Sequence, residues 1–471
     1  MKTLIENNFP GSLRYKFFLT LVAILLIPVV LLLTSLVRSE LALLSMAGIA
    51  LVFLFVFNFN ITLNFLVITF FINYLFFSWK VAVLFVPILL LSFLLTQQSI
   101  QKEDFRNSLT KYFIIYMLTC LPSFMNSAVL MGSLVLSLHF LAFLVVIYSI
   151  AIFMRKKEQI SYYVNMFLIL CLINGINVLI AVALYGGRKF GFAGLMYVDY
   201  VNIAIIINLI MVVIKRKSPI PKVVFLITLS IFVLVSVLMQ TRSTWIAFAA
   251  TFALLIMYFY KKSSFYNITR IKIIYFISII TLLLTATVLL SVRVTDFSER
   301  VTDIEVGEEI NEDADIGNSL VTRMLIWDTA LNAFTVHPYT GVGMYSFPLV
   351  SRAYARIPDV LYDKYVKNLT PHQGYFAVLA ETGIIGFAGF VLMIIMIIRT
   401  AFGNVKKARN EDEKLLSTIL LWILIYIAVS LAITDAWFWG VGIIVWGFFI
   451  GLMLGLKKIV ERGSGRVDGQ G

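Results

Sequence analysis

The sequence predicts an all-α, polytopic integral membrane protein with about 12–14 transmembrane helices and one large external loop. Hydrophobic residues make up 61% of the 471 residues and charged residues only 13%, whereas soluble domains average about 45–50% apolar and about 25% charged residues. So few charges cannot cover a water-exposed surface, and so much apolar surface excludes a disordered chain. The apolar runs are continuous rather than alternating, which favours helices over a membrane β-barrel.

Each predicted span is an apolar run of roughly 16–23 residues, long enough to cross a hydrocarbon core of about 30 Å. The first run lacks a small-residue cleavage site and is too long for a signal-peptide core, so we expect it to remain a span. About 11 spans form an N-terminal bundle over residues 1–292, and the rest lie in 377–456. The candidate spans are 17–37, 41–57, 61–78, 81–96, 112–130, 132–154, 162–184, 197–214, 222–239, 243–260, 272–292, 377–399, 414–433 and 437–456.

Charge distribution predicts the orientation. If the N-terminus is cytoplasmic, 26 of the 38 Lys and Arg residues fall in cytoplasmic segments, as the positive-inside rule requires. Both termini are then cytoplasmic, and 457–471 forms a cytoplasmic tail. Because topology and anionic membrane lipid explain the net charge of +13, a nucleic-acid partner is not needed.

Residues 293–376 form the external, periplasmic-side loop. It opens with nine acidic residues between Asp296 and Asp315. A calcium loop would need a central glycine where Ile316 stands, so the pattern favours a solvated segment over a metal site. Cys120 and Cys171 lie in apolar runs without a CxxC pattern, which argues against a disulfide framework or a cysteine metal site.

An amphipathic helix is predicted next in this loop, capped by Asn318 or Ser319 and stopped by Pro338. Its apolar residues are spaced four or three apart and share one face, either on the membrane surface or against the span ends. Arg323 and Asp328 would lie beside this face. The face consists of Leu320, Met324, Trp327, Leu331 and Phe334.

His372 lies where the loop ends and the twelfth span begins. By position it is the best candidate for a general base, because imidazole can accept a proton near neutral pH; the alternative is a structural role as the helix cap. Glu381, nine residues later, would lie about 13 Å deeper on the opposite face of a regular helix. We therefore expect a structural or cavity-lining role for Glu381. Gly383 and Gly386 would let another helix approach closely.

Two external arginines are not explained by topology. Arg242 lies in a short external link at the start of a helix, with Thr241 or Ser243 as its cap, so a guanidinium meets free amide groups and the helix dipole. Arg188 lies in another external loop, before Asp199 and Asn202. Both suit an anion; the alternative for each is contact with lipid headgroups. The turn Gly341-Val342-Gly343 is a weak phosphate signal.

The chain resembles the bacterial O-antigen ligase and O-antigen polymerase superfamily of membrane glycosyltransferases. The resemblance covers roughly residues 180–400. One departure is Gln373, where members often have Asn or Ser. The stretches that carry the resemblance are 187–192 with Asn202, 241–247, Arg323 and Trp327 with 337–343, and 372–375 with 381–386.

The resemblance implies a GT-C-type fold in the bacterial cytoplasmic (inner) membrane, acting without a bound metal, cofactor or nucleotide sugar. The donor would be a glycan on undecaprenyl diphosphate, and the acceptor a hydroxyl of a glycan or of lipid A-core. Arg242, Arg188 and the weaker candidate Arg323 would bind the diphosphate, where charge develops. His372 would act as the base, and Glu381, Asn202 and Trp327 would support the site.

Other functions also fit many spans. A lipid-linked oligosaccharide flippase or another transporter would more often show an internal repeat and charges at mid-membrane, whereas the distinctive polar residues here gather on the external side. A non-catalytic assembly subunit would have no need of His372. The sequence does not separate a ligase from a polymerase.

Overall fold

The structure, a computed structural model, is entirely helical and loop over the part of the chain that it describes. Six helices in this part are long and apolar enough to cross a membrane. The predicted all-α, polytopic class is confirmed. The predicted spans 17–37 and 272–292 and the acidic stretch 296–315 lie outside the described residues, which are 56, 58–72, 79–96, 109–127, 130–185, 196–214, 222–239, 241–262, 266, 319–435, 437 and 440–464.

Most helix boundaries lie within a few residues of the predicted ones, and α10 (Tyr197–Ile214) begins and ends as predicted. The largest differences are at the C-terminal ends of α18 (Gly374–Lys407) and α20 (Gly440–Ser464), each of which extends eight residues beyond its predicted span. The remaining helices are α4 (Phe59–Ile72), α5 (Trp79–Thr96), α7 (Thr110–Met125), α8 (Leu130–Phe153), α9 (Lys157–Tyr185), α11 (Lys222–Leu238), α12 (Arg242–Lys261), α15 (Ser319–Val336), α16 (Phe347–Val350), α17 (Asp359–Tyr365) and α19 (Glu411–Ser430), with a 3₁₀ turn, η2 (Ser351–Ala353).

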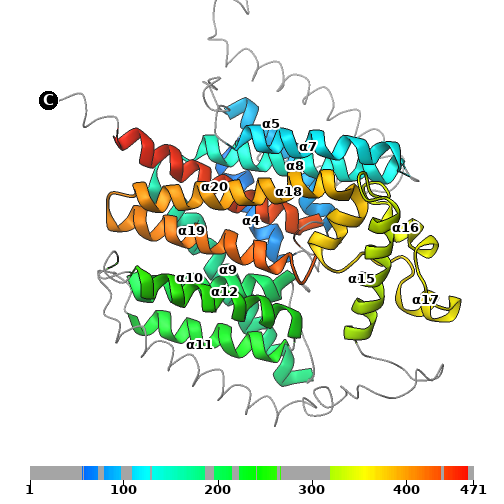
Figure 1. Ribbon diagram of the computed structural model, residues 1–471. Coiled ribbons are helices and arrows are strands. Elements are labelled where there is room, and N and C mark those ends of the chain that lie inside the picture. The colour runs from blue at the N-terminus through cyan, green and yellow to red at the C-terminus, as the bar shows by residue number, and fades with distance from the viewer. Residues whose placement is uncertain are drawn as a thin grey trace, which may run out of the picture.

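Most of the long helices lie with their axes roughly parallel or antiparallel to one another, and together they form a single bundle (Figure 1). Within this bundle, α10 is buried on almost every side, as expected for a helix that is apolar around most of its circumference. In contrast, α9 exposes a stripe of isoleucines, including Ile169, Ile173 and Ile180. Such an exposed apolar stripe is typical of a lipid-facing surface.

A glycine repeat packs α20 against α8. Gly447, Gly451 and Gly455 are spaced four residues apart on α20, and a Cβ atom at Gly451 would lie 2.8 Å from the Cβ of Ile150 on α8. Small residues at this spacing let two membrane helices approach closely. Van der Waals contact then stabilises the pair, because the hydrophobic effect does not drive helices together in an apolar lipid environment.

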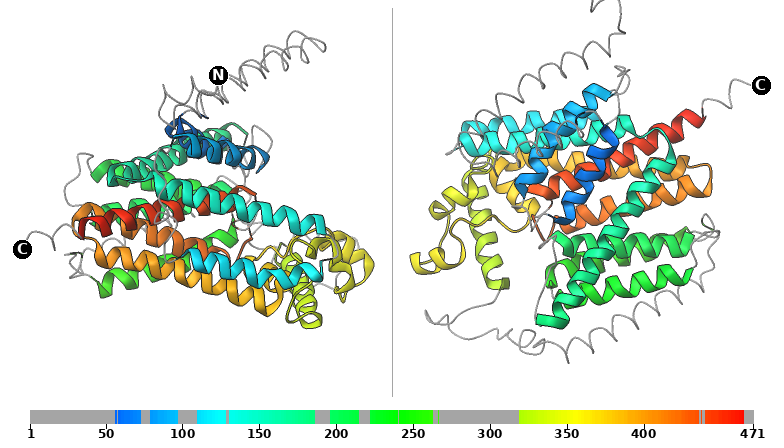
Figure 2. Two further views of the ribbon diagram at one scale, coloured as in Figure 1. Left: turned by 90° about the horizontal axis from the view of Figure 1, so that it is seen from above. Right: turned by 180° about the vertical axis from the view of Figure 1, so that it is seen from behind.

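The segment from α15 to α17 lies at one end of the bundle (Figures 1 and 2). We call this the site end, and the end with the α18–α19 turn and the end of α20 the opposite end. As predicted, α15 begins at Ser319 and ends before Pro338. Of the two alternatives for its apolar face, packing against the span ends does not hold for Met324 and Leu331, which are exposed; contact of this face with the membrane surface stays a prediction.

The buried face of α15 is shifted by one residue from the predicted face. Ile326, Ala330 and Ala333 are buried in a small core with Phe347 and Tyr365. One residue corresponds to about 100° around a helix. The physical reason is that α15 packs on α18, where the small side chains of Ala330 and Ala333 permit closer contact than larger ones would.

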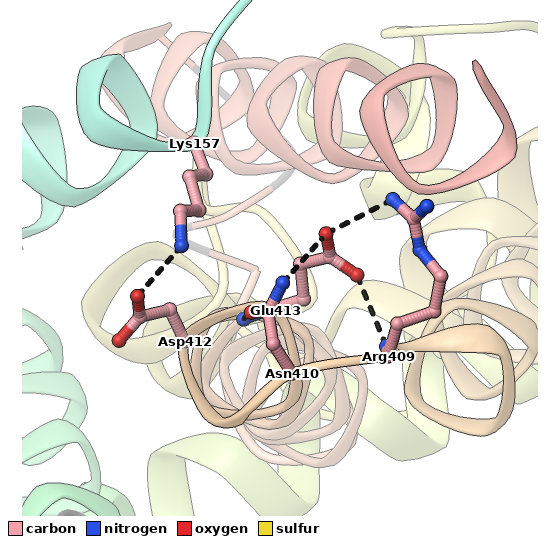
Figure 3. Close-up of polar contacts among 5 residues, drawn as sticks. All are labelled: Lys157, Arg409, Asn410, Asp412 and Glu413. Carbon is pink, nitrogen blue, oxygen red and sulfur yellow. Dashed lines mark hydrogen bonds and ion pairs between the residues drawn. The ribbon is translucent and has the colours of Figure 1, made fainter. Parts of the chain in front are cut away.

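The α18–α19 turn fixes the opposite end of the bundle (Figure 3). Asn410 caps α19, because its Oδ1 accepts the Glu413 N–H at 2.9 Å, while Glu413 Oε2 accepts the Arg409 N–H at 3.0 Å. The arrangement resembles a capping box, except that the Glu413 side chain reaches the amide of the residue before the cap. Lys157, at the start of α9, pairs with Asp412 at 2.7 Å and ties a third helix to the turn.

The charge distribution predicts that the site end is external. In a chain without Cys120 and Cys171, a cysteine at Lys364 should react with a membrane-impermeant maleimide in spheroplasts, and a cysteine at Glu411 should react only after lysis. A reporter at Ile310 should likewise be external. The reverse pattern would invalidate the assignment of the site described below.

Candidate active site

A break in α18 organises the site. Gly383 interrupts the helix with φ 63° and ψ −169°, which leaves neighbouring backbone groups without helical partners. The turn 338–343 supplies these partners: Val342 N–H donates to the Ala380 carbonyl at 3.0 Å, and Ile384 N–H donates to the Pro338 carbonyl at 2.8 Å. The turn 338–343 is thus built into the break in the helix.

Glycine is required at both contact points. Gly341 (φ +66°) and Gly383 (φ +63°) adopt left-handed backbone, which glycine favours. A Cβ at Gly341 would lie 2.3 Å from the backbone carbon of Glu381, and one at Gly383 would lie 2.4 Å from that of Tyr339. The predicted neighbour of Gly383, another helix, is therefore wrong; a loop approaches there because the helix is broken.

The turn 341–343 does not serve as a phosphate cradle. Its three amides are already engaged: Gly341 N–H donates to His337, Val342 N–H to Ala380 and Gly343 N–H to Glu381. The weak phosphate signal of the two glycines is therefore explained by backbone packing instead.

Glu381 fastens the same turn with its side chain. The residue is buried, and its Oε2 accepts the Tyr345 N–H at 2.9 Å. Among the described residues, Oε1 has no hydrogen-bond partner. A buried acid needs such a partner, and the Tyr345 amide provides it; the structural role of Glu381 stays a prediction.

Two contacts position the segment that carries His372. Trp327 Nε1 of α15 donates to the Pro371 carbonyl at 3.0 Å. Gly374 N–H donates to the Leu431 carbonyl at 2.8 Å, which ties the start of α18 to the link between α19 and α20. Helix α15 and the link between α19 and α20 therefore converge on this segment.

His372 is not the cap of α18. The cap is Gln373, whose side-chain oxygen accepts the Phe376 N–H. The helix-cap alternative for His372 is therefore wrong. The capping bond of Gln373 also explains why Gln can replace the Asn or Ser that family members often have at this position. Asn and Ser are themselves good caps, and the longer Gln side chain reaches the same kind of backbone amide. His372 has a left-handed backbone (φ 51°), and its side chain is 42% exposed.

Asp435, in the α19–α20 link, is the partner that the sequence reasoning missed. His372 Nδ1 lies 3.8 Å from Asp435 Oδ1, which is longer than a hydrogen bond; the contact is an ion pair only when the imidazole is protonated. The other ring nitrogen can then face an acceptor substrate. The available signal was a single carboxylate in a short external link between two apolar spans.

Asp435 is a carboxylate at neutral pH. Burial works to raise its pKa, but the neighbouring His372 and Thr370 side chains outweigh burial, and the pKa is lowered from its ordinary value. Arg323 lies near enough to interact with this charge: burial lowers the pKa of its guanidinium, and Asp435 opposes that shift. The structure thus pairs His372 with Asp435 and places Arg323 within electrostatic range of that carboxylate.

The lowered pKa of Asp435 predicts a pH-dependent stability. Its ionised form should stabilise the fold above the unfolded pKa of about 3.9, and this contribution should disappear as the pH falls through the lower folded pKa. Asp435→Asn should therefore lower the melting temperature in detergent at pH 7. The difference from the unsubstituted chain should persist down to about pH 5 and shrink as the pH falls below about 4, toward the lower folded pKa; a difference that stays constant below about pH 4 would contradict the assigned charge state.

A buried polar network supports the α19–α20 link. Asp199 of α10 accepts hydrogen bonds from Tyr426 and, at 3.1 Å, from Ser430. Trp437 Nε1 donates to Ser430 Oγ at 3.1 Å. Asn202 joins the network by donating to Tyr426 Oη at 3.0 Å. The two residues at the start of α10 therefore hold the last spans in register.

Asn202 also reaches the start of α12. Its Nδ2 lies 3.3 Å from the Thr244 carbonyl. Arg242 is the first residue of that helix, and Thr241 is its cap residue but makes no side-chain capping bond. The helix start at Arg242 agrees with the prediction, while the Arg242 side chain and all of Arg188 lie outside the described atoms.

Comparison with known families bears on this arrangement. Residues 224–391 match the O-Antigen ligase family model. The chain contains an O-antigen ligase domain. A search of curated proteins finds no match. The O-antigen ligase domain runs from α11 into α18 and includes Arg242, Arg323 and His372, whereas Arg188, Asn202 and Asp435 lie outside it.

The O-antigen ligase domain confirms the predicted superfamily resemblance. It indicates membrane glycosyl transfer of the ligase or polymerase type, with a lipid-linked glycan and an acceptor as the general substrates. Together with the long apolar helices, it describes a multi-pass membrane protein.

Proposed function

We propose that the protein transfers a glycan from undecaprenyl diphosphate to an acceptor hydroxyl at the outer face of the cytoplasmic membrane. The observation that carries this proposal is the pairing of His372 with Asp435, with Arg323 within electrostatic range of the carboxylate, in a chain that contains an O-antigen ligase domain. The acceptor would be a glycan or lipid A-core.

His372 would accept the proton of the acceptor hydroxyl. As the oxygen attacks the anomeric carbon, the carbon–oxygen bond to the diphosphate breaks, and the lipid diphosphate leaves. Asp435 would hold the imidazole and stabilise the imidazolium that forms, as a carboxylate behind a histidine does. One base and one direct displacement give inversion at the anomeric carbon, without a metal.

The departing diphosphate gains negative charge and needs fixed cations. Arg242, at an α12 start without a side-chain cap, would combine a guanidinium with the helix dipole. Arg188 would be a second contact. Arg323, near Asp435, would be the weaker third one, because the carboxylate offsets part of its charge.

The supporting residues would keep these groups in register. Trp327 holds the segment before His372, Glu381 holds the external turn, and Asn202 links α12 to α19. A displacement of about 1 Å at such a site costs about 100-fold in rate, so these contacts act through geometry.

The glycan profile of a strain that lacks the chain tests this proposal. Loss of a ligase would leave long polymer on its lipid carrier, and loss of a polymerase would leave single-repeat glycan. A flippase would instead leave single repeats on the cytoplasmic side of the membrane, and this result would refute the proposal. Membranes of the complemented strain should still transfer glycan when EDTA removes divalent metal ions.

A further inference from the structure

A cavity of about 360 Å³ lies at the opposite end of the bundle from the proposed active site. It is formed by the start of α7, the last third of α18 and the end of α20. At 1.5 Å per residue, it is about 40 Å along α18 from His372. Its lining residues are Lys111, Tyr112, Met396, Arg399, Thr400, Gly403, Asn404, Lys407, Lys457 and Glu461.

The described lining of the cavity is strongly basic, with four cations and one carboxylate. Lys407 pairs with that carboxylate, Glu461, at 3.0 Å. Arg399 is exposed and has no acidic side chain within ion-pair distance among the described residues. The excess positive charge favours an anion, and a guanidinium binds phosphate oxygens with two parallel hydrogen bonds.

Gly403 keeps the cavity open. It lies inside α18, where glycine destabilises a helix relative to alanine, and a Cβ at this position would meet no atom within 4 Å. Packing against a neighbouring helix therefore does not require glycine here. Its absent side chain leaves space beside Arg399 and Thr400.

The basic lining of the cavity continues into an apolar surface on α7 and α18. Met396 lines it, and the exposed side chains of Ile395 on α18 and of Ile114 and Leu118 on α7 continue along the same helices toward the middle of the bundle. A ligand with a phosphate headgroup and hydrocarbon chains matches this sequence of surfaces better than a free phosphate ion does.

We propose that this cavity binds the headgroup of an anionic phospholipid from the leaflet at the opposite end of the bundle. Arg399 and Lys111 contact the phosphodiester, and the acyl chains lie along α7 and α18. Basic pockets between transmembrane helices bind anionic headgroups in this way. The proposal rests on the cavity alone and does not depend on the glycosyl transfer proposed above.

Native mass spectrometry of the full chain in detergent, titrated with phosphatidylglycerol or phosphatidylethanolamine, tests the proposal. Phosphatidylglycerol should bind and phosphatidylethanolamine should not. Each cation near the headgroup contributes about fivefold in affinity, so Lys111→Gln with Arg399→Gln should weaken binding about 25-fold. Gly403→Leu should also abolish binding, because it fills the cavity without changing charge.

Lys406→Gln is the matched control, since Lys406 is an exposed cation of the same helix that does not line the cavity. It should leave binding unchanged. Equal loss in Lys406→Gln, unchanged binding in Gly403→Leu, or equal binding of both lipids would each overturn the proposal. Displacement of the lipid by millimolar inorganic phosphate would identify a free-anion site instead and would also overturn it.

Discussion

Replacing His372 with asparagine is expected to lower the rate of glycan transfer by roughly 10²–10⁴, the usual effect of removing a general base. Asparagine tolerates left-handed backbone, so the φ of 51° at this position adds little strain. Gln373 caps α18, so no cap is lost. The loss should therefore lie in catalysis and leave the fold intact.

His337→Asn is the matched control, because His337 lies in the same segment between α15 and α18 and contacts Tyr354 edge to face, with ring centroids 5.9 Å apart. It should transfer at a near-normal rate. Binding of the lipid diphosphate should survive in His372→Asn, since the arginines make that contact. A folded His372→Asn variant with normal transfer would eliminate the base role.

Arg242→Ala is expected to reduce transfer by on the order of 10²–10³, the usual effect of losing a contact to developing charge. Arg242→Lys should also transfer poorly, because lysine lacks the two-pronged donor geometry of arginine. Unlike His372→Asn, Arg242→Ala should weaken binding of undecaprenyl diphosphate. Rates and lipid binding are measured on the same purified variants.

Arg352→Ala controls for the loss of a cation from the site end. Arg352 is exposed and pairs with Asp359, and exposed pairs contribute little to stability. This variant should retain transfer. If Arg242→Ala is stably expressed and fully active, the diphosphate is not held at the start of α12.

The sequence is informative about the bundle because the membrane requires continuous apolar helices. The boundaries of α10 and the start and stop of α15 follow from hydropathy, caps and Pro338. These signals are local: each depends on a few neighbouring residues and on water or lipid around them.

The hydrogen bonds between the turn 338–343 and the break in α18 at Gly383 could not be predicted from such local signals. A regular helix was the reasonable expectation there, and the break is stabilised only by hydrogen bonds from Pro338–Gly343, about 40 residues away in sequence. The glycines of the two motifs indicated tight backbone but did not identify their partners.

The missed pairing of His372 with Asp435 has the same cause. The two residues are 63 positions apart, and they meet because Gly374 bonds to Leu431 at the end of α19. Likewise, the apolar residues of α15 suggested a face that is one residue away from the buried one, because contact with α18 selects the small alanines.

Single-turnover transfer by the purified chain in nanodiscs tests the central claim most directly. The substrates are a glycan on undecaprenyl diphosphate and an excess of acceptor. We expect one new glycosidic bond with inverted anomeric configuration for each undecaprenyl diphosphate released, and a much slower reaction with His372→Asn although the donor is still bound. Movement of the intact lipid-linked glycan across the bilayer without bond cleavage, or retention of configuration, would contradict the proposed reaction.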